Sequence, residues 1–379
     1  MKIGIVCYPT FGGSGVVATE LGKALAERGH QIHFVTYNQP ARLDLFSENL
    51  FYHEVAVSKY PLFDFPPYEL ALASRLVDVV RFEKLDILHV HYAIPHASAA
   101  FMAKQILATY GINIPFVTTL HGTDITLVGK DRTYSPVVTF SINKSDGVTA
   151  VSEHLRKDTF EFFDIENEIR VIPNFIDLNR FSLKAKDHFK KAIAPAGEKI
   201  LVHTSNFRKV KRTEDVVKIF AQVVKKIPSK LLMVGDGGER SVCEQLARDL
   251  GIADHVRFLG KQDAIEEILS VSDLFLMPSQ SESFGLAALE AMACKVPVIS
   301  TNAGGLPELN VDGETGFLRD VGDVDGMAER AIYMLEDDER LAQFKENALA
   351  RAKVFDLANI LPLYENYYRE VIERSGSQL

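Results

Sequence analysis

Short apolar runs alternate along the chain with longer segments whose apolar residues recur at helical spacing. The runs are rich in β-branched residues and have little polar alternation, which is typical of strands buried on both faces of a parallel sheet. Segments 15–30 and 213–227 have the period of amphipathic helices. The expected strands are residues 2–7, 32–36, 86–91, 115–121, 147–151, 170–172, 199–205, 230–235, 256–260, 273–277 and 297–300. This alternation predicts an α/β fold built as two doubly wound domains.

The alternation is interrupted once, and the interruption indicates a boundary between the two domains. Residues 176–198 are polar and end in a proline and a glycine before a fresh strand, so we place a linker there. Residues 1–175 then form the first domain and 199–356 the second, while a last helical stretch, 357–379, could return to pack on the first domain. Ligands bind at the carboxyl ends of strands in such sheets, so we expect the chemistry in strand-to-helix loops facing a cleft between the domains.

Composition excludes several classes of protein. The chain of 379 residues has a formal net charge of −9, which argues against nucleic acid as a partner. No run of eighteen apolar residues occurs and the first residues lead straight into a strand pattern, so we expect neither a membrane segment nor a signal peptide. Three scattered cysteines without a C-x-x-C pair favour reduced thiols in a cytoplasmic protein. The sequence leaves open whether copies of the chain form a homo-oligomer.

The first candidate loop is YPTFGGSGVVATELG, in which residues 12–15 lead from a strand into a helix. Glycines let a backbone approach a ligand closely, and a helix N-terminus favours an anion. The spacing is not G-x-G-x-x-G and no acidic residue ends the second strand, so a nicotinamide cofactor is disfavoured. The alternative for this loop is a tight turn in which Ser14 caps the helix.

Four histidines form the second candidate, because His89, His91, His96 and His121 lie at or just beyond strand ends. A zinc site deserves consideration, yet no cysteine or nearby carboxylate completes a four-ligand set. Hydrogen-bonding histidines are therefore favoured over metal ligands. His121 precedes a glycine that leaves room for a ligand, whereas His89 better suits a satisfied core residue.

A cationic run, RKVKR at 208–212, follows the first strand of the second domain. A run of charges is usually a solvated surface, but this one lies between a strand and a helix. Two cationic side chains there suit a diphosphate, which arginine and lysine bind by charge-assisted hydrogen bonds. No G-x-x-x-x-G-K-[ST] occurs, so a P-loop is excluded.

The stretch SESFGLAALEAMA places two carboxylates, Glu282 and Glu290, eight residues apart. If residues 283–285 form the first turn of a helix, their free N–H groups can bind an anion or sugar hydroxyls. The two glutamates would then be separated by about 80° of rotation and roughly 12 Å of rise along that helix. Glu282 also fits a first-turn acid that complements the helix dipole, but Glu290 among apolar neighbours needs a partner or a ligand hydroxyl.

These motifs together resemble the retaining glycosyltransferases of family four, whose GT-B architecture has two Rossmann-like domains. The E-x7-E pattern at 282–290 is the signature of that superfamily. The ordered set GGSGVVATELG, LHVHYAIPHA, TTLHGTDIT, SNFRKVKR, FLGKQD and SESFGLAALEAMA is most similar to a branch of that family in bacillithiol biosynthesis. That branch transfers N-acetylglucosamine from UDP-N-acetylglucosamine to the hydroxyl of L-malate, so the resemblance implies these two substrates and no metal.

The resemblance also implies roles by position in the donor site. Glu282 would hold the 3-hydroxyl of the donor sugar and Glu290 the ribose of UDP. Lys211, with Arg208 or Asn206, would neutralise the diphosphate; many relatives have arginine where this chain has Asn206, so the arginine involved stays open. The further donor-binding residues that it implies are Gly13, Ser14, Lys261, Gln262, Ser283, Phe284 and Gly285.

For the acceptor side, the resemblance implies that His121 contacts the 6-hydroxyl of the sugar beside the reacting carbon. The acceptor-binding candidates are Ser14, Tyr92, Thr119 and Thr123. Catalysis would rest on His121, Glu282, Lys211 and Arg208, which stabilise charge as the diphosphate leaves. The D-x-D at 323–325 resembles a helix cap more than a magnesium site.

Three alternatives remain open at this point. The same fold could serve another acceptor, such as an inositol phosphate, a lipid or a glycan. The chain could bind a sugar nucleotide without chemistry. A sugar-nucleotide epimerase would need acidic catalysts, and none is identifiable in the sequence.

Overall fold

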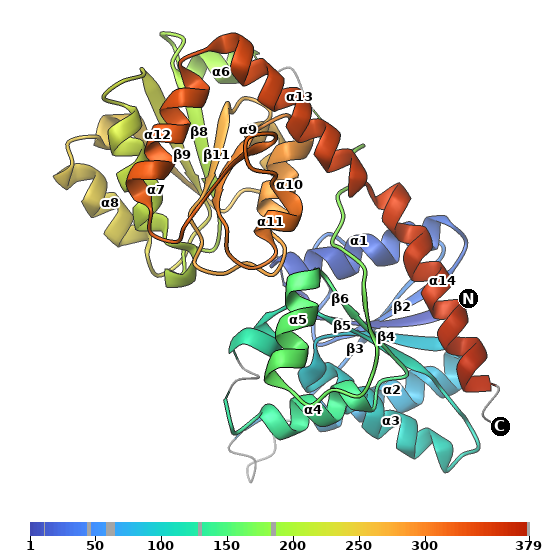
Figure 1. The fold of residues 1–379 in the computed structure, drawn as a ribbon. Coiled ribbons are helices and arrows are strands. Elements are labelled where there is room, and N and C mark those ends of the chain that lie inside the picture. Colours follow the sequence, from blue (N-terminus) through green and yellow to red (C-terminus); the bar gives the residue numbers. More distant parts are fainter. Residues whose placement is uncertain (11, 44–46, 58–64, 128–130, 183–186, 377–379) are drawn as a thin grey trace. The chain divides into compact units, whose positions relative to one another are not determined.

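The structure is a computed structural model that describes residues 1–10, 12–43, 47–57, 65–127, 131–182 and 187–376 (Figure 1). The chain forms two compact units. The first comprises Met1–Asn174 together with Leu357–Leu379, and the second comprises Phe175–Asp356. Each unit has its own parallel sheet, so each is described by itself.

The first unit is built on seven parallel strands in the order β3-β2-β1-β4-β5-β6-β7. The strands are β1 (Lys2–Val6), β2 (Gln31–Thr36), β3 (Leu50–Glu54), β4 (Ile87–His91), β5 (Phe116–Leu120), β6 (Gly147–Ala150) and β7 (Ile169–Val171). The order runs outward in both directions from β1 and β4, so the switch point of this doubly wound sheet lies between them. The loops that follow β1 and β4 therefore run in opposite directions, and it is between such loops that sheets of this kind bind ligands.

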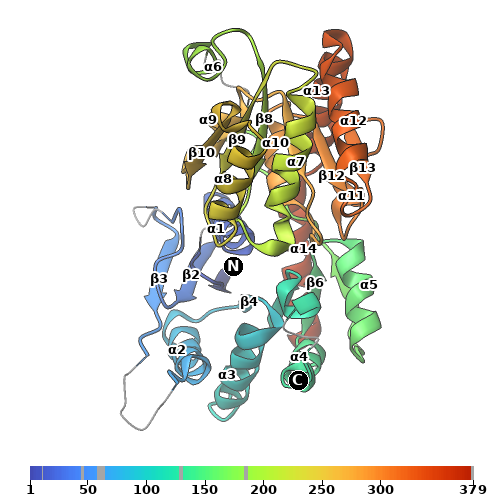
Figure 2. The ribbon, with the colours of Figure 1, turned by 90° about the vertical axis from the view of Figure 1, so that its left-hand side faces the viewer.

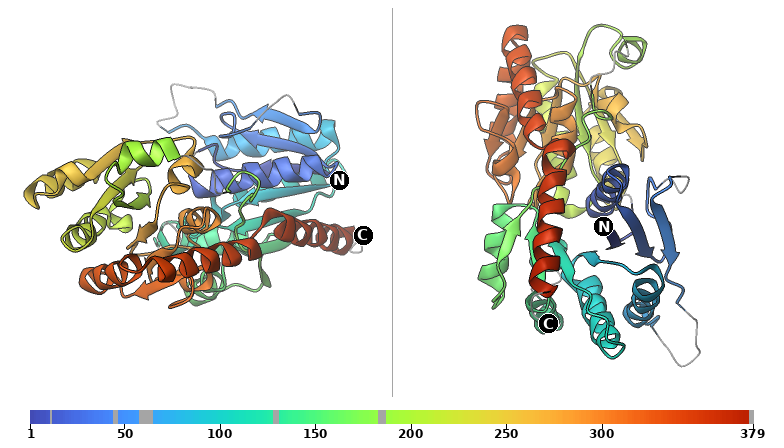
Figure 3. Two further views of the ribbon diagram at one scale, coloured as in Figure 1. Left: turned by 90° about the horizontal axis from the view of Figure 1, so that it is seen from above. Right: turned by 90° about the vertical axis from the view of Figure 1, so that its right-hand side faces the viewer.

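Helices cover both faces of this first sheet. They are α1 (Gly13–Glu27), α2 (Tyr68–Glu83), α3 (Ser98–Ala108), α4 (Ser135–Asn143), α5 (Glu153–Phe162) and α14 (Leu357–Gly376), with the turns η1 (Ala93–Ala97) and η2 (Thr123–Leu127). Helices α2, α3 and α4 lie side by side (Figure 2), and α14 runs beside α1 on the opposite face (Figure 3). Buried Leu76, Val80, Ala103 and Leu107 of α2 and α3 pack on Val90 of β4, which gives that face its apolar core.

The second unit repeats the architecture with six parallel strands in the order β10-β9-β8-β11-β12-β13. They are β8 (Lys199–Thr204), β9 (Ser229–Val234), β10 (Val256–Gly260), β11 (Leu274–Met277), β12 (Val298–Thr301) and β13 (Gly316–Arg319). The helices are α6 (Asp187–Ile193), α7 (Thr213–Val223), α8 (Arg240–Asp249), α9 (Ile265–Leu269), α10 (Leu286–Ala293), α11 (Leu306–Leu309), α12 (Val324–Leu335) and α13 (Asp338–Val354), with the short 3₁₀ turns η3 (Lys209–Lys211) and η4 (Ala253–His255). Residues of α7, α8 and α12 share one core with the sheet.

The expected fold class is confirmed, and all eleven expected strands exist within one or two residues at each end. Two strands were missed. Strand β3 has a mixed burial pattern at the edge of its sheet, and only two of the four residues of β13 are buried, so neither gives an apolar run. Residues 176–198, expected to be a linker, lie in the second unit and include α6, whose Ile193 is buried.

Among the helices of the described residues, none combines the length and the apolar character needed to cross a membrane.

Candidate active site

In the first unit, the loop after β1 meets the end of β4. Helix α1 begins at Gly13 with Gly12 as its N-cap, and no side chain caps it. Ser14 is thus inside the helix, and its Oγ accepts a hydrogen bond of 2.7 Å from the hydroxyl of Tyr92. The alternative that Ser14 is the helix cap is wrong. The bond brings together two of the residues expected to bind the acceptor.

The histidines beyond β4 and β5 form a buried hydrogen-bonded group. The Nδ1 of His91 lies 2.7 Å from the Nε2 of His121, and the Nδ1 of His96 donates to the carbonyl of His91. Burial lowers the pKa of His121 to about 3, that of His96 to about 4, and that of His91 well below its ordinary value. All three rings are therefore neutral at physiological pH and act through hydrogen bonds rather than charge.

The hydrogen-bond partners of this group determine where the protons lie. The Nε2 atoms of His91 and His96 are buried and have no partner among the described residues. A buried lone pair without a donor costs less than a buried N–H without an acceptor, because a carbonyl or imine tolerates such under-satisfaction better. His91 then carries its proton on Nδ1 and donates to His121, which leaves the proton of His121 on its own Nδ1.

His89 is a core residue rather than part of a ligand site. Its Nδ1 pairs with the hydroxyl of Tyr368 in α14, and its Nε2 pairs with Thr119, both at 2.7 Å. Thr119 is wholly buried, and its hydroxyl also pairs with Thr149. Thr119 is therefore disfavoured as an acceptor ligand, because its hydroxyl is bonded to His89 and Thr149 inside the sheet. Thr123 is exposed at the start of η2 and stays a candidate.

Asp124 organises the loop that carries His121, and the sequence reasoning missed it. Its carboxylate accepts from the backbone N–H groups of Gly122 at 3.1 Å and Ala93 at 3.0 Å, which joins the loop after β5 to the turn after β4. Burial raises its pKa to about 6, although these backbone donors oppose the rise. An aspartate two residues after a glycine at a strand end is a turn-forming signal that could have identified it.

In the second unit, the cationic run after β8 is divided between different partners. The Nζ of Lys211 lies 2.5 Å from Oε1 of Glu282, which also accepts from Ser279 at 2.9 Å. Arg212 is paired with Asp215 at 2.6 Å and so is committed to the first turn of α7. Arg208 and Asn206 are exposed beside the same loop. Lys211 and Glu282 are brought together as the sequence predicted, and their contact is direct.

The E-x7-E segment departs from the expected helix. Helix α10 begins at Leu286, and Gly285 precedes it in the left-handed region with φ of 102°. Residues 283–285 thus form a loop rather than a first turn, so the expected rotation and rise between the two glutamates are wrong. Glu282 lies in this loop and Glu290 lies half-buried in the middle of α10. Phe284 is buried, and its ring packs on Phe355 with centroids 5.4 Å apart.

Two glycines after β12 support this loop. The N–H of Gly305 donates to the carbonyl of Glu282 at 2.9 Å. Gly304 has φ of 64°, and a Cβ there would lie 1.9 Å from the same carbonyl oxygen. Only a residue without a side chain fits such an approach. The contacts of Gly304 and Gly305 therefore fix the backbone at Glu282, and the carboxylate of the same residue pairs with Lys211.

The remaining expected donor residues follow β10, where Lys261 and Gln262 are exposed and the amide of Gln262 donates to the carbonyl of Leu259 at 2.7 Å. Asp323 accepts from the N–H of Gly326 at 2.9 Å and caps α12, so the interpretation of the D-x-D as a helix cap is confirmed.

His203 of β8 is buried beneath this site and was missed. Its Nε2 pairs with Ser205 at 2.8 Å, and burial lowers its pKa to about 4.

Comparison with known proteins identifies the family. A model described as glycosyltransferase family 4 matches residues 11–180, and one described as glycosyl transferases group 1 matches residues 184–351. N-acetyl-alpha-D-glucosaminyl L-malate synthase of Bacillus anthracis is 50% identical over 374 residues, which are 98% of this chain and 97% of that protein. The chain belongs to the family 4 glycosyltransferases. The resemblance seen in the sequence is confirmed, and with it a retaining glycosyltransferase activity.

A more distant relative and two solved structures are also similar to this chain. D-inositol 3-phosphate glycosyltransferase 2 of Catenulispora acidiphila is 26% identical over 407 residues, covering 96% of this chain and 91% of its own. HepE of Anabaena, solved with UDP and glucose, superposes with a TM-score of 0.82 at 22% identity over 97% of this chain and 99% of its own. Sucrose-phosphate synthase of Thermosynechococcus elongatus gives 0.81 at 22% identity over 99% and 100%. These two solved structures therefore share the α/β fold of this chain.

Proposed function

We propose that this glycosyltransferase moves N-acetylglucosamine from UDP-N-acetylglucosamine to the hydroxyl of L-malate, the first step of bacillithiol biosynthesis. The observation that carries the proposal is the 50% identity, over nearly the whole of both chains, to a protein named for that product. The polar loops at the strand ends of both units supply groups suited to such a donor and acceptor.

The donor would be held by the second unit. Lys211 is paired with Glu282, with only 19% and 11% of these side chains exposed. A donor diphosphate would share Lys211 with Glu282, while the carboxylate accepts from a sugar hydroxyl. Arg208 or Asn206 would add a second contact to the diphosphate, and the N–H groups of 283–285 would bind phosphate or sugar. Glu290 would take the ribose, with the backbone at Lys261 and Gln262 beside uracil.

The first unit would present His121 to the sugar. Its Nε2 is occupied by His91, and its Nδ1 has no hydrogen-bond partner among the described residues. With the proton on Nδ1, the neutral ring offers an N–H donor to a sugar hydroxyl. The glycine loop at Gly13, with Ser14, Tyr92 and Thr123, would hold L-malate.

The reaction exchanges one bond to the anomeric carbon for another. The bond from that carbon to the β-phosphate oxygen breaks, and a bond to the malate hydroxyl oxygen forms on the same face. The hydroxyl proton passes to the departing phosphate oxygen, because same-face transfer brings the acceptor hydroxyl next to that oxygen. Preorganised donors at a developing negative charge contribute about 10²–10³-fold each in comparable sites. In this proposal Lys211 supplies the positive charge that stabilises the departing diphosphate, and no metal is required.

The experiment uses purified protein, UDP-N-acetylglucosamine, and L-malate, D-malate or an inositol phosphate as acceptor, with and without EDTA. We expect UDP release that requires L-malate and survives EDTA, and a product of α configuration by NMR. UDP release with inositol phosphate but not with L-malate would show that the enzyme uses another class of acceptor. Tight donor binding without any release would instead support a non-catalytic sugar-nucleotide-binding protein, and a β product would refute the same-face mechanism.

A further inference from the structure

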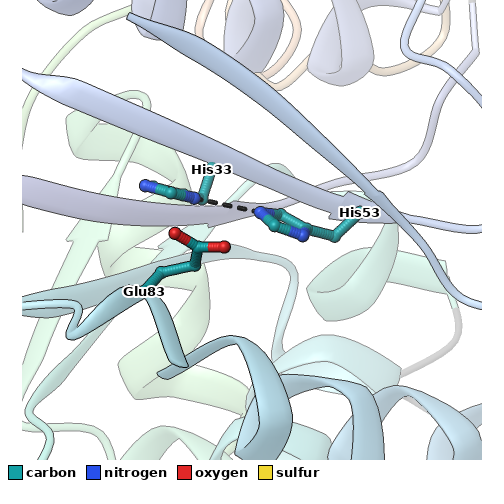
Figure 4. A group of neighbouring side chains, drawn as sticks. All are labelled: His33, His53 and Glu83. Carbon is teal, nitrogen blue, oxygen red and sulfur yellow. Dashed lines mark hydrogen bonds between the residues drawn. The ribbon is translucent and has the colours of Figure 1, made fainter. Parts of the chain in front are cut away.

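A cluster of three metal-ligating side chains lies in the first unit on elements that the glycosyltransferase chemistry does not use. His33 of β2, His53 of β3 and Glu83 at the end of α2 each place a ligand atom within 4.8 Å of the other two. Figure 4 shows the carboxylate of Glu83 directed at the gap between the two imidazole rings. In the described part of the chain this is the one such cluster of histidine, cysteine, aspartate or glutamate.

The register of the sheet creates the pair of histidines. Strands β2 and β3 are parallel, and Val35 is paired with His53 while His33 is paired with Phe51. His33 and His53 are therefore two positions out of step and share one face of the sheet. Their ring planes lie within 16° of each other, and the Nδ1 of His33 is 3.0 Å from the Nε2 of His53. The ring of Phe51 lies against His33 at 14° and 4.7 Å, which limits its rotation.

The separation of the two nitrogens is near that of two ligands on one ion. Zinc–nitrogen bonds of about 2.0–2.1 Å at a tetrahedral angle place two nitrogens roughly 3.3–3.4 Å apart. The observed 3.0 Å must widen by only a few tenths of an ångström. An imidazole binds such an ion through the lone pair of its neutral ring, and each of the two rings has a nitrogen within reach of a shared ion. Glu83 contributes one negative charge and a third ligand.

We propose that His33, His53 and Glu83 bind a divalent transition-metal ion of the zinc class, which fastens the edge strand β3 to β2 and α2. Two imidazoles and one carboxylate suit zinc or cobalt(II), with water completing four ligands, and do not suit magnesium or calcium, which prefer oxygen alone. Strand β3 is an edge strand of its sheet and pairs with β2 alone, so the ion would add a second attachment for it. This site is independent of the proposed acceptor.

Two cations face the cluster and limit its affinity. Lys2 contributes to the lowered pKa of His33, and Arg75 of α2 contributes to that of His53, so both positive charges act on the ligands. The Nε2 of His33 is buried without a partner among the described residues and would have to carry the ring proton when Nδ1 binds the ion. We therefore expect weaker binding than at a four-ligand structural zinc site. Removing the charge of Arg75 should tighten it.

The test titrates tag-free protein, stripped with EDTA and returned to chelator-free buffer, with zinc chloride in a calorimeter and with cobalt chloride in a spectrophotometer. The variants are H53N and E83Q, which each remove a ligand, and R75M, which removes a facing charge. H154N is the matched control, because His154 is a half-exposed histidine of α5 that lies outside the cluster and is paired with Asp158 of its own helix. Glycosyltransferase turnover and circular dichroism verify that each variant is folded.

We expect one zinc ion per wild-type chain, a visible cobalt spectrum of a four-coordinate site, and a rise in Tm with zinc. H53N and E83Q should each lose at least about tenfold in affinity, H154N should match wild type, and R75M should bind more tightly. Wild type without a zinc isotherm or a cobalt spectrum would overturn the proposal. So would folded H53N that binds zinc with unchanged stoichiometry and affinity.

Discussion

At the scale of single residues, the donor half-site depends on one ion pair. Lys211 and Glu282 meet at 2.5 Å with little solvent access, and Ser279 holds the same carboxylate oxygen. This pair fixes the position of the Lys211 Nζ relative to the loop that carries Glu282. The neighbouring Lys209 is exposed in the same 3₁₀ turn, so position rather than charge distinguishes the two lysines.

Replacing Lys211 should therefore slow the enzyme far more than replacing its neighbour. For K211M we expect kcat to fall by about 10²–10³-fold, because a fixed positive charge at the leaving diphosphate is lost. K209M is the control and should stay within about twofold of wild type, as a solvated lysine contributes little. Initial rates of UDP release measure both. Equal losses in the two variants would mean that general positive charge, not this lysine, is required.

His91 is a positioning residue in this account, because its ring orients His121. We expect H91L to lower kcat by about tenfold or more, as the loss of a buried hydrogen bond is worth about 1–3 kcal/mol. The Kd for UDP should not change, since the groups assigned to UDP lie in the other unit.

The comparison variant for His91 is Y368F, which breaks the bond to His89 instead. It should lower the free energy of unfolding by about 1–3 kcal/mol without a comparable loss of kcat. If His91 has a purely structural role, H91L should, like Y368F, lower the free energy of unfolding without a comparable loss of kcat.

At the scale of elements, the loop that carries Glu282 is supported by contacts with the loop after the neighbouring strand β12. Gly304 and Gly305 after β12 contact the backbone of Glu282 and Ser283, which leaves no room for a Cβ. The E-x7-E segment is thus positioned by the next strand-to-helix loop along the sheet.

Replacing Gly304 by a residue with a side chain should destabilise the contact between this loop and the backbone of Glu282. G304A places a Cβ 1.9 Å from the carbonyl oxygen of Glu282 at a left-handed φ of 64°. We expect a loss of about 2–5 kcal/mol in the free energy of unfolding, from strain and overpacking together. Gly313 has φ of 76° with open space around it, so G313A should lose only about 1–2 kcal/mol. Urea unfolding of both variants gives the comparison, and similar losses would show that the close approach is unimportant.

The sequence predicted elements and loops better than it predicted contacts. Apolar runs located eleven strands because strands buried on both faces leave a strong local signal, whereas β3 and β13 leave a weak one. The sequence also placed Lys211 and Glu282 in one site. It could not show that the helix begins only at Leu286, nor that Thr119 is committed inside the sheet, because both depend on neighbours distant in the chain. The pair of His33 and His53 was missed for the same reason, because it depends on the register of two strands. Asp124 was missed although a local turn signal, the glycine two residues before it, marks its position.

At the scale of the whole molecule, buried neutral histidines make the two units unequally sensitive to acid. Wholly buried His89, His96 and His121 belong to the first unit and have pKa values of about 3, 4 and 3, against one such residue, His203 at about 4, in the second. Each pKa is lower folded than unfolded. Their contribution to stability is therefore present above about pH 6.5 and is lost as the pH falls toward the folded values.

We accordingly expect the first unit to be destabilised first as the pH is lowered from about 7 to 5. Each such histidine costs about 1.4 kcal/mol per pH unit below its unfolded pKa. Asp124 acts in the opposite direction, because its raised pKa of about 6 removes an unfavourable buried charge on protonation. Hydrogen exchange in urea, corrected for the intrinsic effect of pH and assigned by peptide, measures the two units separately. A larger acid loss in the second unit would contradict this expectation.

The most direct test of the account is a crystal structure of the protein with UDP-N-acetylglucosamine and L-malate. We predict the diphosphate against Lys211 and the N–H groups of 283–285, the ribose at Glu290, and a sugar hydroxyl at the carboxylate of Glu282. A nucleotide bound without contact to Lys211 or Glu290 would contradict it.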